Sequence, residues 1–297
     1  MRMRATVAAV SGALTLSALV VPAVAQAADG TRPSFDSIAA GAAAELQTGL
    51  KADAPASAEA RGGVAARAAA ALDISVSGVS VNKNKDIVVG TTGGYQVPIT
   101  YTVNHSGDLG SFASIPLIYH GSSISTATWG YSADDVATCA DVSATAVKCS
   151  ATFTFLPAEL INSDAGTWRV AVIGATETDD VTLENVATRK VLRTSKVTVD
   201  AAPEPVKKGA TITVTGKLTR ADWDTNTYVG YGSQSVVLQY RPKTSTTYTN
   251  VKGIKSTSTG ALKTTVKASA SGYYRFVFNG SPTGGKATAT GDYIGVK

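Results

Sequence analysis

Residues 272–280 read GYYRFVFNG, a stretch in which large apolar side chains recur at every second position. Successive side chains of a β-strand point to opposite faces of the sheet. The pattern therefore predicts a strand that buries Tyr274 and the later apolar residues and turns Arg275 toward solvent. Residues 166–174, GTWRVAVIG, share the arrangement of Gly, aromatic, Arg, alternating apolar residues and Gly. This repeat predicts two domains of related architecture, with Arg169 in the place of Arg275.

The same alternation recurs along most of the chain. The runs are short, rich in Val, Ile, Thr and Tyr, and separated by Gly, Asn, Asp and Ser. Such spacing is typical of antiparallel β-sandwiches and not of a parallel α/β sheet. The predicted strands cover residues 74–76, 79–81, 97–103, 152–155, 168–172, 191–199, 212–218, 236–240, 262–266, 274–278 and 293–296.

The start of the chain has the features of an export signal. A basic tetrapeptide precedes an apolar run at 5–21, Pro22 breaks helix, and 25–27 read Ala-Gln-Ala. Small residues at alternate positions are what signal peptidase requires, so we expect a signal peptide at 1–27 and cleavage after it. The alternative is a membrane anchor, which the proline and the cleavage site disfavour. We expect a secreted, extracellular protein with no membrane span after cleavage.

Charge and cysteine content limit the kinds of partner and the cellular compartment that are expected. The chain has 27 Lys and Arg against 22 Asp and Glu, and loss of the signal peptide leaves a net charge of +3. Because the basic residues look scattered, we expect no nucleic-acid partner. The two cysteines, Cys139 and Cys149, are expected to form one structural disulfide in an exported protein.

Composition divides the remainder into three parts. Residues 28–72 are Ala-rich with proline and glycine breakers, so we expect a flexible segment or pro-region in which 38–46 has helical character. A first β-sandwich is expected at 73–200 and a second at 201–297. The prolines at 203–205 predict a stiff joint between them.

Four motifs in the last third of the chain resemble those of immunoglobulin-like domains in secreted, Ala-rich actinobacterial proteins. They are KGATITVTG at 208–216, QSVVLQYR at 234–241, TGAL at 259–262 and SGYYR at 271–275. The resemblance extends loosely over 73–200. It implies an all-β fold of two tandem immunoglobulin-like antiparallel sandwiches, and it supplies no catalytic residue, because such folds serve many functions.

Catalytic chemistry finds little support. The chain has two histidines, His105 and His120, and no Gly-x-Ser-x-Gly motif for a hydrolytic nucleophile. We therefore expect a non-enzymatic protein without a cofactor.

Two candidate ligand sites remain. Trp223, Tyr228 and Tyr231 lie among Asn, Thr and Gly, a composition that suits a sugar ring or a protein partner. The alternative is that Trp223 closes one end of its sandwich and the tyrosines flank an edge strand.

The second candidate is a calcium site in a loop. Asp179, Asp180 and Glu184 supply the oxygen ligands that calcium prefers, although their spacing is not that of an EF-hand. The alternative is a set of solvated turn residues.

The function expected is that of an exported structural or interaction protein. Its tandem sandwiches would present surfaces to a cell-envelope or extracellular partner, either protein or polysaccharide. The alternatives are a polysaccharide-binding module that uses the loop aromatics and a calcium-binding secreted protein.

Overall fold

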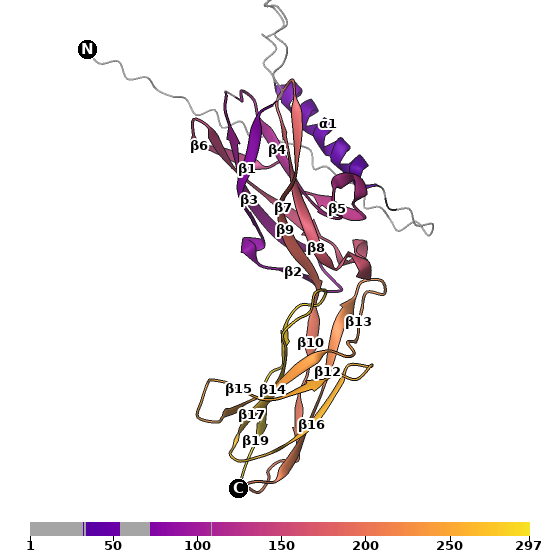
Figure 1. Ribbon diagram of the computed structural model, residues 1–297, viewed down its shortest axis with the longest axis vertical. Helices are drawn as coiled ribbons and strands as arrows, with labels where there is room; N and C mark the ends of the chain where they lie inside the picture. The colour runs from indigo at the N-terminus through magenta and orange to yellow at the C-terminus, as the bar shows by residue number, and fades with distance from the viewer. Residues whose placement is uncertain (1–31, 33, 54–71, 108) are drawn as a thin grey trace, which may run out of the picture. The chain divides into compact units, whose positions relative to one another are not determined.

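The computed structural model describes residues 32, 34–53, 72–107 and 109–297 (Figure 1). The predicted signal peptide and residues 54–71 lie outside the described residues. Within the described ranges the fold is all-β with one α-helix, and the strands form four sheets. Each pair of sheets shares one hydrophobic core, so the chain contains two β-sandwiches, as the alternating pattern predicted. No helix in these ranges is long and apolar enough to cross a membrane.

The first sandwich faces a four-stranded sheet against a five-stranded one. The four-stranded sheet has the order β1 (Ile74–Val81), β3 (Tyr95–His105), β7 (Ala146–Phe155) and β6 (Thr138–Ser143). The five-stranded sheet has the order β2 (Ile87–Val89), β9 (Asp180–Arg193), β8 (Gly166–Ala175), β4 (Ala113–His120) and β5 (Trp129–Ser132). Every pairing in these two sheets is antiparallel except that of β2 with β9, which is parallel.

The second sandwich is built around the long strand β12. One sheet contains β10 (Ser195–Val197), β11 (Asp200–Ala202), β13 (Thr227–Gly230) and β16 (Ala261–Lys267), all paired with β12 (Thr211–Asp222). The other has the order β15 (Thr249–Lys255), β14 (Ser235–Pro242), β17 (Gly272–Phe278) and β18 (Ala287–Thr288), with β19 (Asp292–Ile294) also on β17. Short 3₁₀ turns occur in the first sandwich at Asn82–Asn84, Ile124–Thr126, Pro157–Glu159 and Asn162–Asp164.

The chain passes between the sandwiches at Thr194, and not at the prolines. The predicted strand at 191–199 is split, because β9 ends at Arg193 and β10 pairs with β12 of the second sandwich. The Thr194 amide donates to Val89 O at 2.9 Å, and its carbonyl accepts the Ala221 amide at 2.8 Å. Both sides of the junction are extended strand, so residues 191–199 were predicted as one strand. The prolines at 203–205 lie inside the second sandwich, after β11.

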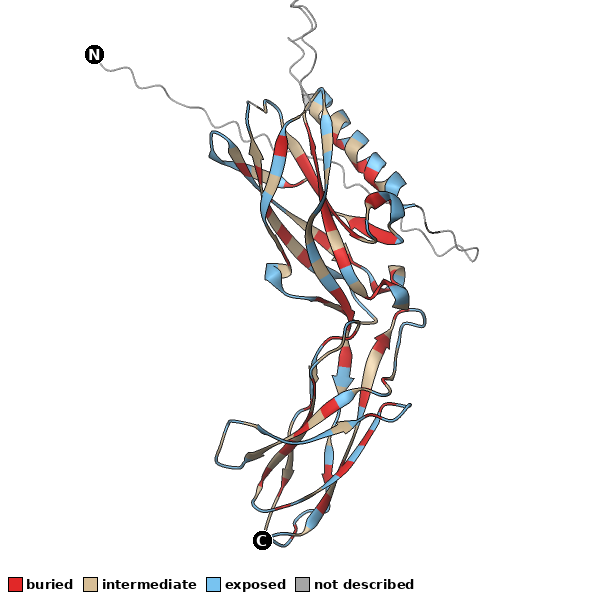
Figure 2. Cartoon of the chain, viewed as in Figure 1, coloured by how far each residue is buried: buried red, intermediate tan, exposed pale blue. Residues whose placement is uncertain are grey.

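The predicted alternation agrees with the burial of β3 and β17, whereas β4 and the second half of β8 are buried continuously (Figure 2). In β3, every second residue from Val97 to Val103 is buried. The two repeats that indicated related domains form β8 and β17, each in the interior of its sheet. Trp168 and Tyr274 are buried at equivalent positions, and the arginines that follow them are only partly buried.

Residues 35–53 form α1 (Phe35–Asp53), which packs on the first sandwich beside β4 and β5 (Figure 1). The prediction of a flexible segment is therefore wrong for this part of 28–72. The buried helix residues share one face and are spaced by three or four positions. They are Phe35, Ala39, Ala42 and Leu46. Alanine-rich composition indicated too little apolar surface for docking, but small side chains also let a helix approach a sheet closely.

Phe35 attaches the start of α1 to the first sandwich, a contact that the composition of the segment did not indicate. Its side chain is 1 % exposed and its ring stacks on Tyr119 with centroids 5.7 Å apart. The ring also lies directly over Gly130, where a Cβ would sit 2.4 Å from Phe35 Cε2. Phe35 is therefore the largest of the side chains that hold the helix against the sheet, together with Leu46 and the partly buried Ile38 and Leu50.

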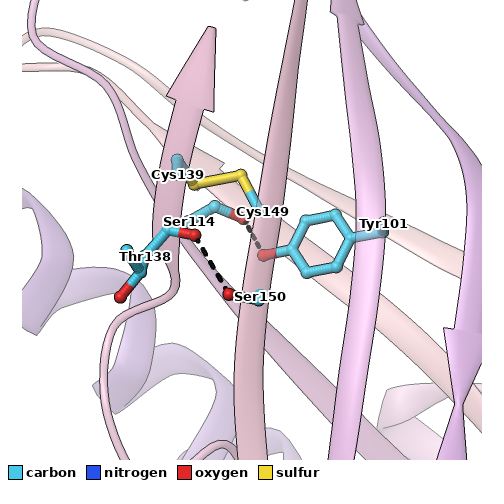
Figure 3. The surroundings of a disulfide bond; sticks show 6 residues. All are labelled: Tyr101, Ser114, Thr138, Cys139, Cys149 and Ser150. Atoms are coloured by element: carbon cyan, nitrogen blue, oxygen red, sulfur yellow. Dashed lines mark hydrogen bonds between the residues drawn. A yellow bond between two sulfur atoms is a disulfide. The ribbon is translucent and has the colours of Figure 1, made fainter. Parts of the chain in front are cut away.

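The disulfide between Cys139 and Cys149 is confirmed (Figure 3). The two residues are directly opposite each other on β6 and β7, with Cα atoms 4.1 Å apart. Cys149 is also opposite Tyr101 on β3, whose hydroxyl lies 2.7 Å from Ser114 Oγ. The bond therefore ties an edge strand to its own sheet, unlike the inter-sheet disulfide of antibody domains.

Removal of the disulfide is expected to weaken the first sandwich moderately. A Cys139→Ser, Cys149→Ser variant should lose about 2–3 kcal/mol of unfolding free energy, the value for closing a short loop. Urea unfolding of the oxidised wild type and the variant measures the difference. A reduced wild-type protein should match the variant, and unchanged stability in both would contradict the assignment of a structural role.

Buried tyrosines make stability fall at alkaline pH. Burial raises the pKa of Tyr101 to about 12, and burial together with the neighbouring Glu184 raises the pKa of Tyr119 to about 12. In the unfolded chain a phenol loses its proton near pH 10. Between pH 10 and 12 the unfolded state therefore binds fewer protons than the folded state, and the free energy of unfolding decreases.

A Tyr101→Phe variant should lose less stability over this interval than the wild type does. Urea midpoints measured from pH 8 to the alkaline limit test this, since all other titrating groups are shared. Parallel pH profiles for the two proteins would show that Tyr101 titrates normally.

Candidate functional site

The predicted loop platform of aromatic residues is not formed. Trp223 is 2 % exposed and belongs to the hydrophobic core of the first sandwich, although it follows a strand of the second. Its Nε1 donates to Gly90 O at 3.0 Å. The prediction that Trp223 binds a ligand is therefore wrong. It closes one end of a sandwich, as the alternative proposed, but that sandwich is the first and not its own.

Asn162 explains how the Trp223 backbone is held. Its Oδ1 accepts the Trp223 amide at 3.0 Å and also a hydrogen bond from Arg193. Its side-chain Nδ2 donates to Asp222 at 3.0 Å and to Asp224 at 2.6 Å. The backbone amide of Asn162 also donates to Asp224, at 2.9 Å. The hydrogen bond from Asn162 is the main cause of the lowered pKa of Asp222. Every polar atom of this amide side chain is therefore committed to structure.

The two tyrosines near Trp223 are also engaged internally. Tyr231 is 9 % exposed, its hydroxyl lies 2.7 Å from Ser281 Oγ, and the Arg220 guanidinium lies 3.8 Å from its ring centre. Tyr228 is half-buried on the edge strand β13, and Lys196 Nζ lies 3.6 Å above its ring. Neither tyrosine joins Trp223 in a common surface, which agrees with the edge-strand alternative.

The three acidic residues of the predicted calcium site do not converge. Asp179 accepts the Leu72 amide at 2.9 Å, and Asp180 accepts Gln47 Nε2 from α1 at 2.8 Å. Glu184 accepts the Ile124 amide and the Tyr119 hydroxyl at 3.0 and 3.2 Å. Asp180 and Glu184 are four residues apart on one strand, which separates them by about 13 Å.

Within the described ranges, no three His, Cys, Asp or Glu side chains are grouped closely enough to hold a metal ion. The loop acids therefore serve as hydrogen-bond acceptors that attach α1 and neighbouring segments to the first sandwich.

Both histidines make local contacts. His105 Nδ1 donates to Gly107 O at 2.5 Å, and His120 Nδ1 lies 3.0 Å from Thr128 Oγ1. In the part of the chain that the structure describes, neither ring is hydrogen-bonded to a carboxylate that would orient it for general base catalysis.

Charge is divided unequally between the two sandwiches. Residues 201–297 contain 13 Lys and Arg and four Asp and Glu, a net charge of +9 within a chain of net charge +5. The interpretation of the basic residues as evenly scattered is therefore wrong, because the second sandwich carries nearly half of them with few acids. A domain of this charge attracts anionic ligands over a distance set by ionic strength.

The outer face of one sheet of the second sandwich concentrates cations and aromatic rings. Cross-strand register places Arg241 of β14 opposite Tyr273 of β17, and Gln239 opposite Arg275 two pairs further along, on the same face of the sheet. Tyr293 of β19 is opposite Tyr273 on the other side. These residues alternate with the buried ones, so all of them point away from the core. We call this surface the guanidinium–tyrosine face; it consists of Gln239, Arg241, Tyr248, Asn250, Tyr273, Arg275 and Tyr293.

Stacking fixes both guanidinium groups of this face. The Arg241 guanidinium lies 3.9 Å from the ring centre of Tyr273 and 5.3 Å from that of Tyr248. The Arg275 guanidinium lies 3.7 Å from the Tyr248 ring centre, so both arginines use the same tyrosine. Tyr273 and Tyr293 continue the row with centroids 5.2 Å apart. Cation–π contacts of this length hold a flexible side chain in one place.

This face was not predicted from the sequence, although two features of the sequence indicated it. One was the excess of Lys and Arg after residue 200. The other was the Tyr-Tyr-Arg order in 272–280, which places Tyr273 and Arg275 on the solvent side of a strand. The contribution of Tyr248 and Tyr293 has no local signal, because they reach the face from separate segments.

No protein-family model matches the sequence, and no curated protein does. Solved structures with similar folds include a titin Z1Z2 tandem chimera, with 16 % identity over 72 % of this chain and 95 % of the other, at a TM-score of 0.24. The mouse nectin-like molecule 4 ectodomain has 12 % identity over 73 % and 63 %, at 0.24. The Yersinia pseudotuberculosis adhesin InvE has 12 % identity over 74 % and 58 %, at 0.25. These values are too low to carry a functional argument, and the sandwich assignment rests on the sheets themselves.

Proposed function

We propose that this chain is an exported, non-enzymatic interaction protein that binds an anionic component of a cell envelope or extracellular matrix through its second sandwich. The observation that carries the proposal is the separation of charge, with +9 on residues 201–297. The first sandwich then serves as the scaffold on which α1 and the second sandwich are held. Bacterial origin, expected from the sequence resemblance, belongs to the same proposal.

Export is supported by two independent features. The basic, apolar and small-residue order of residues 1–27 is that of a signal peptide. The Cys139–Cys149 disulfide is of a kind that persists in oxidising compartments. Expression of the full chain in a secreting bacterial host tests this step. The protein recovered from outside the cells should begin at Ala28 and have no alkylatable thiol, whereas retention in the cytosol would contradict export.

Binding is tested with the secreted protein and protease-treated cell-envelope fractions. We expect retention that weakens as salt rises, because the attraction depends on exposed charges. A retained fraction that does not change with salt would contradict an anionic partner, and no retention at low salt would contradict envelope binding.

A further inference from the structure

We propose that the guanidinium–tyrosine face binds a carboxylate-bearing polysaccharide, with Arg241 and Arg275 on the carboxylates and the tyrosines on the sugar rings. This deepens the proposed function, on which it rests, by assigning the site and the class of ligand.

The two arginines keep most of their hydrogen-bonding capacity. A guanidinium carries five N–H donors. Arg241 donates one hydrogen bond, to Ser245 O at 2.8 Å, and Arg275 donates one, from Nε to Gln239 Oε1 at 2.9 Å. Among the described residues, no ion pair joins either guanidinium group to a carboxylate. Two positive groups are thus positioned by the fold and left without a counter-charge.

Their common support makes the pair suited to an anionic polymer. The Arg275 guanidinium stacks on the ring of Tyr248, and the Arg241 guanidinium lies 5.3 Å from the centre of the same ring, so the two are held near each other despite their repulsion. A ligand with successive carboxylates relieves that repulsion. Guanidinium groups also match the planar, two-oxygen geometry of a carboxylate.

Tyr248 itself is locked across the face by a close approach to Gly291. A Cβ at position 291 would lie 2.1 Å from Tyr248 Oη, so the hydroxyl occupies the space that a side chain would fill. The arginines therefore bind a ligand without first being ordered, which reduces the entropic cost of association.

The remaining residues of the face suit sugars. Tyr273 and Tyr293 are partly exposed, and their rings are inclined by 58°. Aromatic surfaces with a polar edge pack against the apolar faces of sugar rings, and the hydroxyls meet ring substituents. Asn250 is exposed on β15, at the other edge of the face, and is oriented by a 2.9 Å hydrogen bond from Gln239. An acidic polysaccharide uses both the charged and the aromatic parts of this surface.

The experiment compares two variants with the same loss of charge. Arg241→Gln, Arg275→Gln removes two cations from the face, and Lys263→Gln, Lys267→Gln removes two exposed cations from β16 in the other sheet of the same sandwich. Tyr248→Leu keeps the charge and removes the shared support. The probe is immobilised polygalacturonate, with its methyl ester, neutral dextran and duplex DNA as comparison matrices. Melting curves confirm that each variant is folded.

We expect wild type to bind polygalacturonate and to bind the methyl ester and dextran weakly. The arginine variant should lose affinity by roughly tenfold or more per guanidinium, since hydrogen bonds between charged groups are the strong ones. Tyr248→Leu should fall between it and the wild type, and the lysine variant should change little.

Other outcomes overturn the site or the ligand. Equal losses in the arginine and lysine variants would mean that only net charge matters; the site would then be wrong while the proposed function stood. Equal binding of the methyl ester would exclude carboxylate recognition, and stronger retention on DNA would replace the polysaccharide by nucleic acid. If envelope fractions retain the protein and polygalacturonate does not, the ligand class is wrong; if neither does, the proposed function also fails.

Discussion

Trp223→Ala is expected to lower the free energy of unfolding by about 3–5 kcal/mol, the range for truncating a large buried aromatic residue. The loss arises in the first sandwich, although residue 223 follows a strand of the second. The substitution empties volume in a core shared with Trp168, and leaves Gly90 O without its Nε1 donor. Urea unfolding followed by tryptophan fluorescence and by far-UV dichroism measures the change.

A nearby exposed residue supplies the matched control. Val229 on β13 is 38 % exposed, so Val229→Ala should stay within about 0.5 kcal/mol of wild type. Asn162→Ala should also be destabilising, because it leaves several hydrogen-bond partners unsatisfied. A Trp223→Ala variant as stable as Val229→Ala would contradict the placement of the indole in the core.

Phe35→Ala is expected to release α1 from the first sandwich at a cost of about 3–5 kcal/mol of docking free energy. The other buried helix residues are mainly alanines, which bury little apolar area. Isolated helices of this length are marginal in water, so the undocked segment should also lose helicity. Hydrogen exchange of residues 35–53 in the full chain, compared with β8, measures the effect locally.

Two further variants separate docking from helix propensity. Glu45→Ala changes an exposed helix position and should leave exchange protection unchanged. Gly130→Ala alters no helix residue but places a methyl group against the Phe35 ring, so it should raise exchange in α1. Protection that persists in both Phe35→Ala and Gly130→Ala would show that the helix is held by other contacts.

Local pattern was sufficient for the strands that it predicted and for the disulfide, but it gave no strand at β2, β4, β5, β6, β13 or β15. The alternation in β3 and β17 depends only on neighbouring residues, and the sequence contains only two cysteines to pair. The helical character of 38–46 was also visible, but its docking was not. Docking depended on Phe35, which packs against Tyr119 and Gly130, two residues distant from it in the sequence.

The two candidate sites were also misjudged because local sequence does not show what surrounds a side chain in the fold. An aromatic residue in a polar segment has the same local sequence whether it faces solvent or enters another core. Trp223 was misjudged for this reason, since the cavity that receives it is built by other parts of the chain. The acids at 179–184 were misjudged because Asp180 and Glu184, although they share a face of β9, are about 13 Å apart along the extended strand.

The stretch GYYRFVFNG at 272–280 shows which features follow from the sequence and which depend on the tertiary structure. The sequence by itself determined that this stretch is a strand, that its aromatic residues at alternate positions are buried, and that Arg275 faces solvent. Only the tertiary structure decided that Arg275 meets Tyr248, that Arg241 joins it and that no acid among the described residues neutralises either. Alternation is a property of neighbouring residues, whereas the surroundings of an outward side chain depend on which strands pair beside it.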